Sequence, residues 1–127
     1  MLGGAAAAPA FESRRTNWWP AADITDLPDG EPTPVILRVT REDGYSQVVD
    51  RQVIFLIKEG PAQVTALSST CTHLGCRVSW DASAKLLKCP CHGGVFDRTG
   101  AVKAGPPPAP LPRIDTKVDG NQVMVQL

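Results

Sequence analysis

The residues of this 127-residue chain best suited to chemistry are its four cysteines and two histidines, and all six lie between residues 71 and 92. They form two short boxes, Cys71-Thr72-His73-Leu74-Gly75-Cys76 and Cys89-Pro90-Cys91-His92-Gly93-Gly94. Scattered cysteines usually act as small buried hydrophobic residues, whereas clustered thiol and imidazole groups are typical metal ligands. The two boxes therefore indicate a shared site.

Three arrangements use these residues differently. Two disulfides would leave both histidines without a role. A zinc ion would take four of the six residues, but structural zinc sites usually contain Cys-x-x-Cys pairs. The spacings here, Cys-x-His-x-x-Cys and Cys-x-Cys-His, do not suit a single tetrahedral ion. An iron–sulfur site remains as the third arrangement.

The pairing of Cys-x-His in the first box with Cys-x-x-His in the second resembles the pattern of the Rieske iron–sulfur family. The 2Fe-2S cluster of that family has cysteine ligands on one iron and histidine ligands on the other. The resemblance is close over residues 71–111 and only general elsewhere. It implies that Cys71 and Cys89 bind the inner iron, that His73 and His92 bind the outer iron, and that Cys76 and Cys91 form the disulfide that joins the two cluster loops in one branch of the family.

This implied ligand set suits an electron carrier. Two neutral imidazoles in place of two thiolates remove negative charge from the coordination shell and raise the reduction potential. The second nitrogen of each imidazole also allows electron uptake to be coupled to proton uptake. Glycines at 75, 93 and 94 would let the loop backbone approach the sulfur atoms and donate N–H groups to them.

A proline-rich segment follows the second box, Gly105-Pro106-Pro107-Pro108-Ala109-Pro110-Leu111. By composition alone it would be a stiff linker. In the Rieske family a segment at this place forms a loop that covers the cluster from the side opposite the two boxes. We therefore expect Gly105, Pro106, Pro107 and Pro108 to form such a lid loop.

The rest of the chain predicts an all-β fold, an antiparallel sandwich or barrel. With 43% hydrophobic residues the chain is expected to be one small domain. Asp43-Gly44 and Asp119-Gly120 are hairpin-turn signals, and the apolar run 53–57 suits a central buried strand. The predicted strands are 35–40, 45–49, 52–58, 63–68, 77–80, 85–88, 113–118 and 122–127.

We expect a base formed by residues 17–69 and 105–127 and an inserted cluster-binding subdomain formed by residues 70–104. Residues 1–16, rich in alanine and glycine at their start, are expected to be a flexible hinge or tail. Anchored members of the family have a membrane helix before such a hinge, so the chain is expected to be a soluble head whose anchoring helix lies outside it. A disulfide would fit an extracytoplasmic, periplasmic face of an energy-transducing membrane.

Two branches of the family differ in cysteine content. Rieske ferredoxins, which donate electrons to oxygenases, typically lack the extra cysteine in each box, whereas Rieske subunits of cytochrome bc-type complexes have both. The resemblance to the second branch implies an electron-transfer subunit rather than an enzyme on its own. It would accept an electron from a membrane quinol beside a cytochrome b-type subunit and pass it to a c-type cytochrome. His92 and His73 would contact the quinol and take its proton, and Leu74 would shape the docking tip.

Two positions depart from the high-potential members of the family, which have serine at the position of Gly94 and tyrosine at that of Phe96. Hydroxyl groups there would donate hydrogen bonds to cluster sulfur atoms and stabilise the reduced state. Gly94 and Phe96 lack them, which predicts a lower potential and favours menaquinol over ubiquinol. A zinc-stabilised binding module stays open as a further alternative. No basic stripe with interleaved aromatic residues supports nucleic-acid binding.

Overall fold

The structure, a computed structural model, describes residues 18–70, 75–91 and 93–127. In these ranges it contains strands, one 3-10 turn and no α-helix, and therefore no helix that is long and apolar enough to cross a membrane. The elements are β1 (Trp18–Asp23), the 3-10 turn η1 (Ile24–Asp26), β2 (Thr33–Asp43), β3 (Ser46–Gly60), β4 (Gln63–Ser68), β5 (Ser79–Asp81), β6 (Leu86–Lys88), β7 (Val95–Phe96), β8 (Val102–Ala104), β9 (Arg113–Ile114), β10 (Thr116–Asp119) and β11 (Gln122–Gln126).

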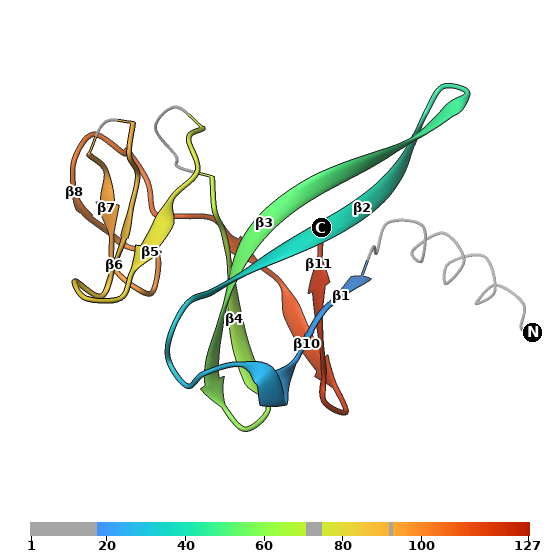
Figure 1. Cartoon of the computed structure of the whole chain (residues 1–127), viewed down its shortest axis with the longest axis horizontal. Helices are drawn as coiled ribbons and strands as arrows, with labels where there is room; N and C mark the ends of the chain where they lie inside the picture. Colours follow the sequence, from blue (N-terminus) through green and yellow to red (C-terminus); the bar gives the residue numbers. More distant parts are fainter. Residues whose placement is uncertain (1–17, 71–74, 92) are drawn as a thin grey trace, which may run out of the picture.

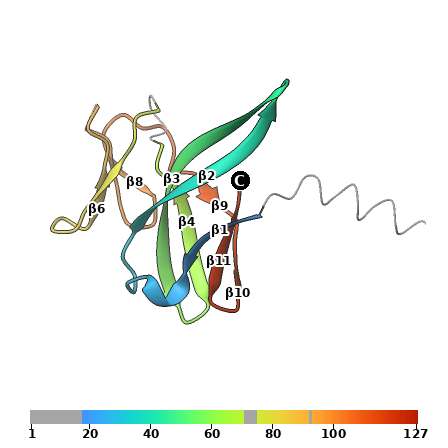
Figure 2. The same cartoon turned by 45° about the vertical axis from the view of Figure 1, so that its right-hand side comes forward.

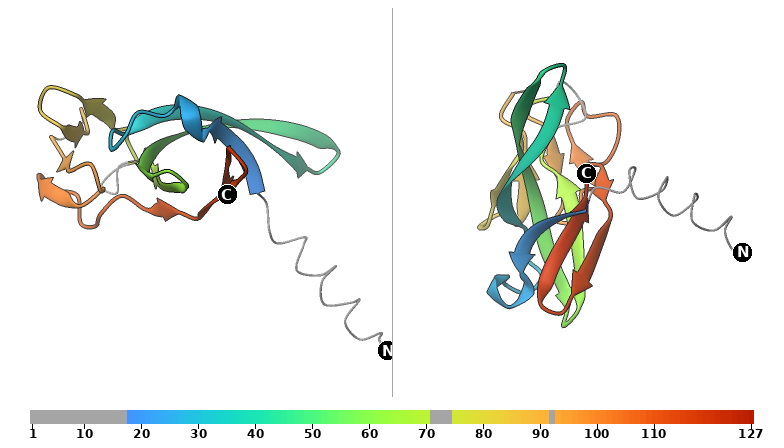
Figure 3. Two further views of the ribbon diagram at one scale, coloured as in Figure 1. Left: turned by 90° about the horizontal axis from the view of Figure 1, so that it is seen from below. Right: turned by 90° about the vertical axis from the view of Figure 1, so that its right-hand side faces the viewer.

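The strands form three antiparallel sheets, with orders β1-β11-β10, β2-β3-β4-β9 and β5-β6-β7-β8. The first two sheets face each other, and the third lies at one side of the pair (Figures 1 and 2). Figure 3 shows the same arrangement from below and from the side. The all-β antiparallel architecture expected from the sequence is confirmed.

Strand β3 divides its side chains between two cores. Alternate residues of a strand point to opposite faces of the sheet. Ile54 and Leu56 therefore pack into a core shared with β1 and β11, whereas Phe55 and Ile57 pack against the third sheet. All four are at most 2% exposed. The apolar run predicted as a central strand thus holds the two parts of the fold together.

The tip of the β2–β3 hairpin reaches beyond both cores. The register of the hairpin runs from Thr33 opposite Leu56 to Asp43 opposite Ser46, and Gly44 occupies the turn with a φ of 67°. A positive φ is costly for most residues but not for glycine, so the predicted turn forms where the sequence indicated it. Within β3, only Ile54–Gly60 pairs with β4, and the far part of the hairpin projects as a two-stranded ribbon (Figure 1).

Several strand boundaries differ from the predictions. The strands predicted at 45–49 and 52–58 merge into one continuous strand that begins at Ser46, because pairing with β2 continues across Asp50 and Arg51. The predicted strand 113–118 is interrupted at Asp115, where the chain passes from the second sheet to the first. The sequence did not predict β1, β7 or β8, whose two to six residues lack the alternation on which such a prediction depends.

Candidate metal centre

Both cysteine boxes start where a strand ends. The first follows β4, and its loop is closed by a bridge between Thr70 and Arg77. The second follows β6, and the N–H of Cys89 donates to the carbonyl of Gly94 at 2.8 Å. These two contacts fix the starts and ends of the loops. Four residues named from the sequence, Cys71, His73, Leu74 and His92, lie outside the described residues.

The described cysteines lie together. Cys76 and Cys91 form a disulfide, with 1.97 Å between their sulfur atoms, so the disulfide expected from the resemblance is present and joins the two loops. The sulfur atom of Cys89 lies within 4.8 Å of both. Because the disulfide occupies two of the three thiols, Cys89 is the one free thiol in the described part of the chain.

Cys89 has the environment of a metal-bound thiolate. Its side chain is 4% exposed and packs in the second core, among apolar residues that include Leu87 and Phe96. Among the described residues it has no hydrogen-bond partner. A soft sulfur donor that is buried, beside a loop that carries further cysteine and histidine residues, fits an iron–sulfur cluster.

The proline-rich segment packs directly on the second box. A β-carbon added at Gly94 would lie 2.7 Å from Cγ of Pro107, and one added at Gly105 would lie 2.8 Å from the carbonyl oxygen of Gly93. Pro107 is buried, and the N–H of Leu111 donates to the carbonyl of Gly100 at 2.9 Å. The segment is thus held against the box at Gly105 and Pro107 and bonded to Gly100 at its end, and does not cross solvent as a linker.

Two aspartates stabilise the turns of the third sheet. Asp97 Oδ1 accepts hydrogen bonds from the N–H and hydroxyl of Thr99 and from the N–H of Ala101. Partial burial opposes its ionisation, but these hydrogen bonds outweigh burial, and the pKa of Asp97 is lowered from its usual value. Asp81 acts in the same way at the β5–β6 turn, where hydrogen bonds from Lys88, Ser83 and Ala84 lower its pKa.

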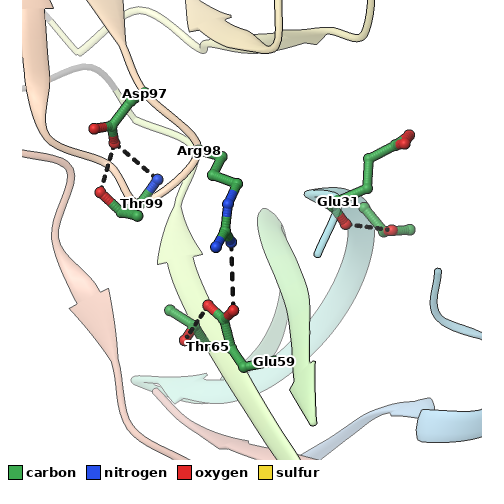
Figure 4. A network of polar contacts seen from close by, with 7 residues as sticks. Glu31, Glu59, Thr65, Asp97, Arg98 and Thr99 are labelled. Carbon is green, nitrogen blue, oxygen red and sulfur yellow. Dashed lines mark hydrogen bonds and ion pairs between the residues drawn. The ribbon is translucent and has the colours of Figure 1, made fainter. Parts of the chain in front are cut away.

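An ion pair joins the third sheet to the base. Nη1 of Arg98, after β7, lies 3.3 Å from Oε1 of Glu59 at the end of β3, and the other carboxylate oxygen of Glu59 accepts from Thr65 at 3.1 Å (Figure 4). Both charged side chains are partly exposed, so the pair is worth less than about 1 kcal/mol. Its role is to orient the turn after β7.

Sequence reasoning did not find these supporting residues. The signals for the two aspartates were present, since Asp81-Ala82-Ser83 and Asp97-Arg98-Thr99 both have the Asp-x-Ser/Thr spacing of turns in which the carboxylate binds the backbone two residues on. No local signal pairs Glu59 with Arg98, which are 39 residues apart in the sequence.

A comparison with protein-family models defines the class of protein. The sequence model of the Rieske [2Fe-2S] domain family matches residues 17–115, which is most of the chain. The chain belongs to this family, and its cofactor is a 2Fe-2S cluster through which it transfers electrons.

The proteins similar to this chain include two kinds, Rieske proteins of membranes and membrane complexes, and ferredoxins of oxygenases. The chain is 38% identical over 81 residues to the cytochrome b6-f complex iron-sulfur subunit of Chlorobaculum tepidum, which covers 64% of the chain and 44% of the relative. The chain therefore spans less than half the length of that relative. Among solved structures it resembles the plasma membrane Rieske protein PetC3 of Synechocystis, with a TM-score of 0.56 and 29% identity over 74% of the chain and 86% of that protein.

A second solved structure that resembles this chain is of the ferredoxin kind. The ferredoxin of carbazole 1,9a-dioxygenase from Nocardioides aromaticivorans has a TM-score of 0.54 and is 29% identical, covering 86% of the chain and 96% of the ferredoxin. The fold alone thus does not separate the two branches.

Proposed function

We propose that this chain is the cluster-bearing head of a quinol-oxidising complex of the cytochrome bc type. It accepts one electron from a membrane quinol, held by a cytochrome b-type subunit, and passes it to a c-type cytochrome. The proposed location is the periplasmic face of an energy-transducing membrane, where a disulfide is stable. The relative from Chlorobaculum tepidum, a subunit of a cytochrome b6-f complex by name, supports this assignment.

The residues have separate roles in this proposal. Cys71 and Cys89 hold one iron, and His73 and His92 hold the other. The cluster supplies the one-electron chemistry. His92, with His73, accepts the hydroxyl proton of the quinol at the ring nitrogen that does not bind iron. Leu74 shapes the surface that meets the quinol-binding subunit.

The observation that carries the proposal is the Cys76–Cys91 disulfide beside the free thiol of Cys89. The proposed ligand set does not use these two cysteines, so their role is to hold the two loops together. A cross-link of this kind stabilises the two loops, because it limits their unfolded states. It favours the bc-type branch over the ferredoxin branch, whose members typically lack these cysteines.

The absence of side-chain hydroxyls at Gly94 and Phe96 favours menaquinol as the donor. Phe96 is fully buried in the same core as Cys89, and Gly94 is buried under Pro107. Neither can donate a side-chain hydrogen bond that would stabilise the more negative, reduced state. The proposed potential therefore lies below the upper end of the family range of roughly −150 to +300 mV.

The ferredoxin reading is the second candidate, because the dioxygenase ferredoxin matches the chain along most of its length. A redox titration of the cluster-loaded chain, followed by its low-temperature EPR signal, separates the two. The proposal expects a midpoint above about 0 mV that falls as the pH rises through the imidazole range. A midpoint near about −150 mV that does not change around neutral pH would contradict it and favour the ferredoxin.

A further inference from the structure

One face of the second sheet is covered over only half of its length. Phe55 and Ile57 of β3 lie on this face and are 2% and 0% exposed, because the third sheet packs on them. Farther along the same face, Ile36 and Val49 are 63% and 57% exposed. We call this bare part the open face. It consists of Ile36, Arg38, Thr40, Val49, Arg51 and Val53, and the register pairs them as Ile36 with Val53, Arg38 with Arg51, and Thr40 with Val49.

The opposite side of the same ribbon is packed. Leu37 is 5% exposed and belongs to the first core, and Val35 and Val39 pack against that core. Ile36 and Val49 are exposed on the other face, one on each side of the Arg38–Arg51 pair, and would add apolar contact area around these two arginines in a complex.

The charges on the open face are arranged for an acidic partner. Arg38 and Arg51 lie directly opposite each other, and like charges at such positions destabilise a sheet. Both are exposed, and neither guanidinium group has an ion pair or hydrogen bond with any described residue. Among the described residues of the ribbon, the one carboxylate on this side is Glu42, nearer the turn. An arrangement that is unfavourable in the isolated chain becomes favourable when a carboxylate is bound between the two guanidinium groups.

The open face continues toward the metal centre. Arg51 and Arg77 line the same cavity, of about 160 Å³, together with Val53 and Thr70. Arg77 follows Cys76 directly in the sequence, so this cavity connects the ribbon with the disulfide-bonded loops. Figure 1 shows the ribbon and the third sheet extending in different directions from the region of β4. A partner bound at the Arg51 end of the open face would lie beside Arg77 and the disulfide-bonded loop that precedes it.

We propose that the open face docks an acidic, partly apolar surface of the protein that receives the electron. The inference rests on the proposed acceptor, a c-type cytochrome, and adds where and by what charge it binds. A carboxylate would bind between Arg38 and Arg51, a second acidic group would bind at Arg77, and apolar side chains would cover Ile36 and Val49. A flat membrane surface fits less well, since the cavity at Arg51 and Arg77 admits a protruding side chain.

The test measures binding of the cluster-loaded chain to an acidic soluble c-type cytochrome and to a basic one, with all proteins oxidised, at low and high salt. We expect binding to the acidic cytochrome only, weakening with salt. Arg38→Glu with Arg51→Glu should weaken it by roughly tenfold or more at low salt. The matched control is Lys103→Glu with Arg113→Glu, which makes the same change in charge at exposed positions on β8 and β9 and should weaken it by less than about twofold.

A second variant guards against misfolding. Arg38→Gln with Arg51→Gln removes the like-charge contact, so it should retain the cluster absorbance and the unfolding midpoint while weakening binding. The proposal would be overturned if the Glu variant and the control lost equal cytochrome affinity. It would also be overturned if the parent chain did not bind the acidic cytochrome. The parent chain and the Glu variant are also tested with phosphatidylglycerol vesicles. If the Glu variant loses vesicle binding but keeps cytochrome binding, the docking proposal is overturned in favour of a membrane surface.

Because this binding needs no electron flow, the two proposals fail separately. One outcome is that the chain binds the acidic cytochrome through Arg38 and Arg51 while menaquinol fails to reduce its cluster. That result would support the docking proposal and contradict the proposed function. If the chain oxidises menaquinol but binds the cytochrome equally well after Arg38→Glu with Arg51→Glu, the proposed function is supported and the docking proposal is contradicted.

Discussion

Gly94 in the second cysteine box and Pro107 in the proline-rich segment are packed so closely that no side chain fits between them. A β-carbon at Gly94 would lie 2.7 Å from Cγ and 3.2 Å from Cδ of Pro107, and 3.5 Å from Cβ of Cys89. Real β-carbons do not approach ring carbons to 2.7 Å, so any larger residue at 94 displaces the segment. The glycine and the proline thus act as a pair that sets how closely the segment lies over Cys89.

Replacing Gly94 with alanine should therefore destabilise the fold. Overpacking of this kind typically costs about 1–3 kcal/mol in the free energy of unfolding, measured here by urea titration. Gly60→Ala is the matched control, because a β-carbon there meets only Gln63 at 3.8 Å and should change the free energy by less than about 0.5 kcal/mol.

Adding Pro107→Ala to Gly94→Ala should restore part of the loss, because it removes the ring that the new methyl group meets. Residues in contact show such non-additivity. If the two substitutions were simply additive, the packing explanation would be wrong.

The contact between Gly94 and Pro107 also affects any test of whether a hydroxyl at residue 94 raises the reduction potential of the cluster. Gly94→Ser introduces a hydroxyl but also displaces Pro107, so its effect on the potential would combine two causes. In a Pro107→Ala background, serine and alanine at 94 share the β-carbon and differ only in the hydroxyl. A hydrogen bond to a cluster sulfur of about 1 kcal/mol corresponds to a rise on the order of 40 mV for a one-electron couple.

We expect the serine variant to have the higher midpoint and Phe96→Tyr to raise it further. Phe96 is 0% exposed, so a tyrosine hydroxyl there must find a partner inside the protein. The measurement is a redox titration of the matched variants at one pH. Equal potentials for serine and alanine would show that the missing hydroxyl does not set the potential.

The disulfide gives a third prediction. Cys76 and Cys91 are 15 residues apart, and closing a loop of about that length stabilises a protein by about 3 kcal/mol. Cys76→Ser with Cys91→Ser should lower the free energy of unfolding by about that amount and accelerate loss of the cluster absorbance.

Each single substitution should be as costly as the double, because one bond is lost in all three variants. That non-additivity is the control, measured by urea unfolding under non-reducing conditions. A double variant that loses twice as much as either single would show that the serines themselves, and not the cross-link, cause the loss.

The sequence predicted those parts of the fold that depend on local patterns. The apolar run 53–57, the turn at Gly44 and the turn at Gly120 each contain their own signal, and each forms as predicted. The disulfide between Cys76 and Cys91 followed from the resemblance of the boxes to a known pattern. The cofactor was predicted in the same way, since two spaced boxes are specific while a single Cys-x-x-Cys is not.

Other features depend on contacts that the sequence does not encode locally. The short strands β7 and β8 form because they pair with β6 and with each other, not because two or three residues have a strong preference. The pairing of Arg38 with Arg51 depends on the hairpin register, and the contact of Gly94 with Pro107 depends on how two loops fold back together. Both emerge only once the chain is folded.

The turn after β7 gives the last prediction, which concerns pH. Asp97 accepts three hydrogen bonds, from Thr99 twice and from Ala101, and the N–H of Gly100 donates to its carbonyl. Asp97→Ala removes the side-chain contacts and should lower the free energy of unfolding by about 1–2 kcal/mol at pH 7. The measurement is urea unfolding followed by tryptophan fluorescence.

The loss in free energy of unfolding caused by Asp97→Ala should become smaller as the pH falls. The pKa of Asp97 is lower in the folded chain than its usual 3.8, so the stabilisation is complete above about pH 5 and decreases as the pH falls through the folded value. At pH 3 and below, parent and variant should therefore approach each other. Asp115→Ala is the matched control, because that side chain makes no hydrogen bond with the described part of the chain and should matter by less than about 0.5 kcal/mol at either pH. A difference between parent and Asp97→Ala that stays constant down to pH 2 would mean that the carboxylate charge does not stabilise this turn.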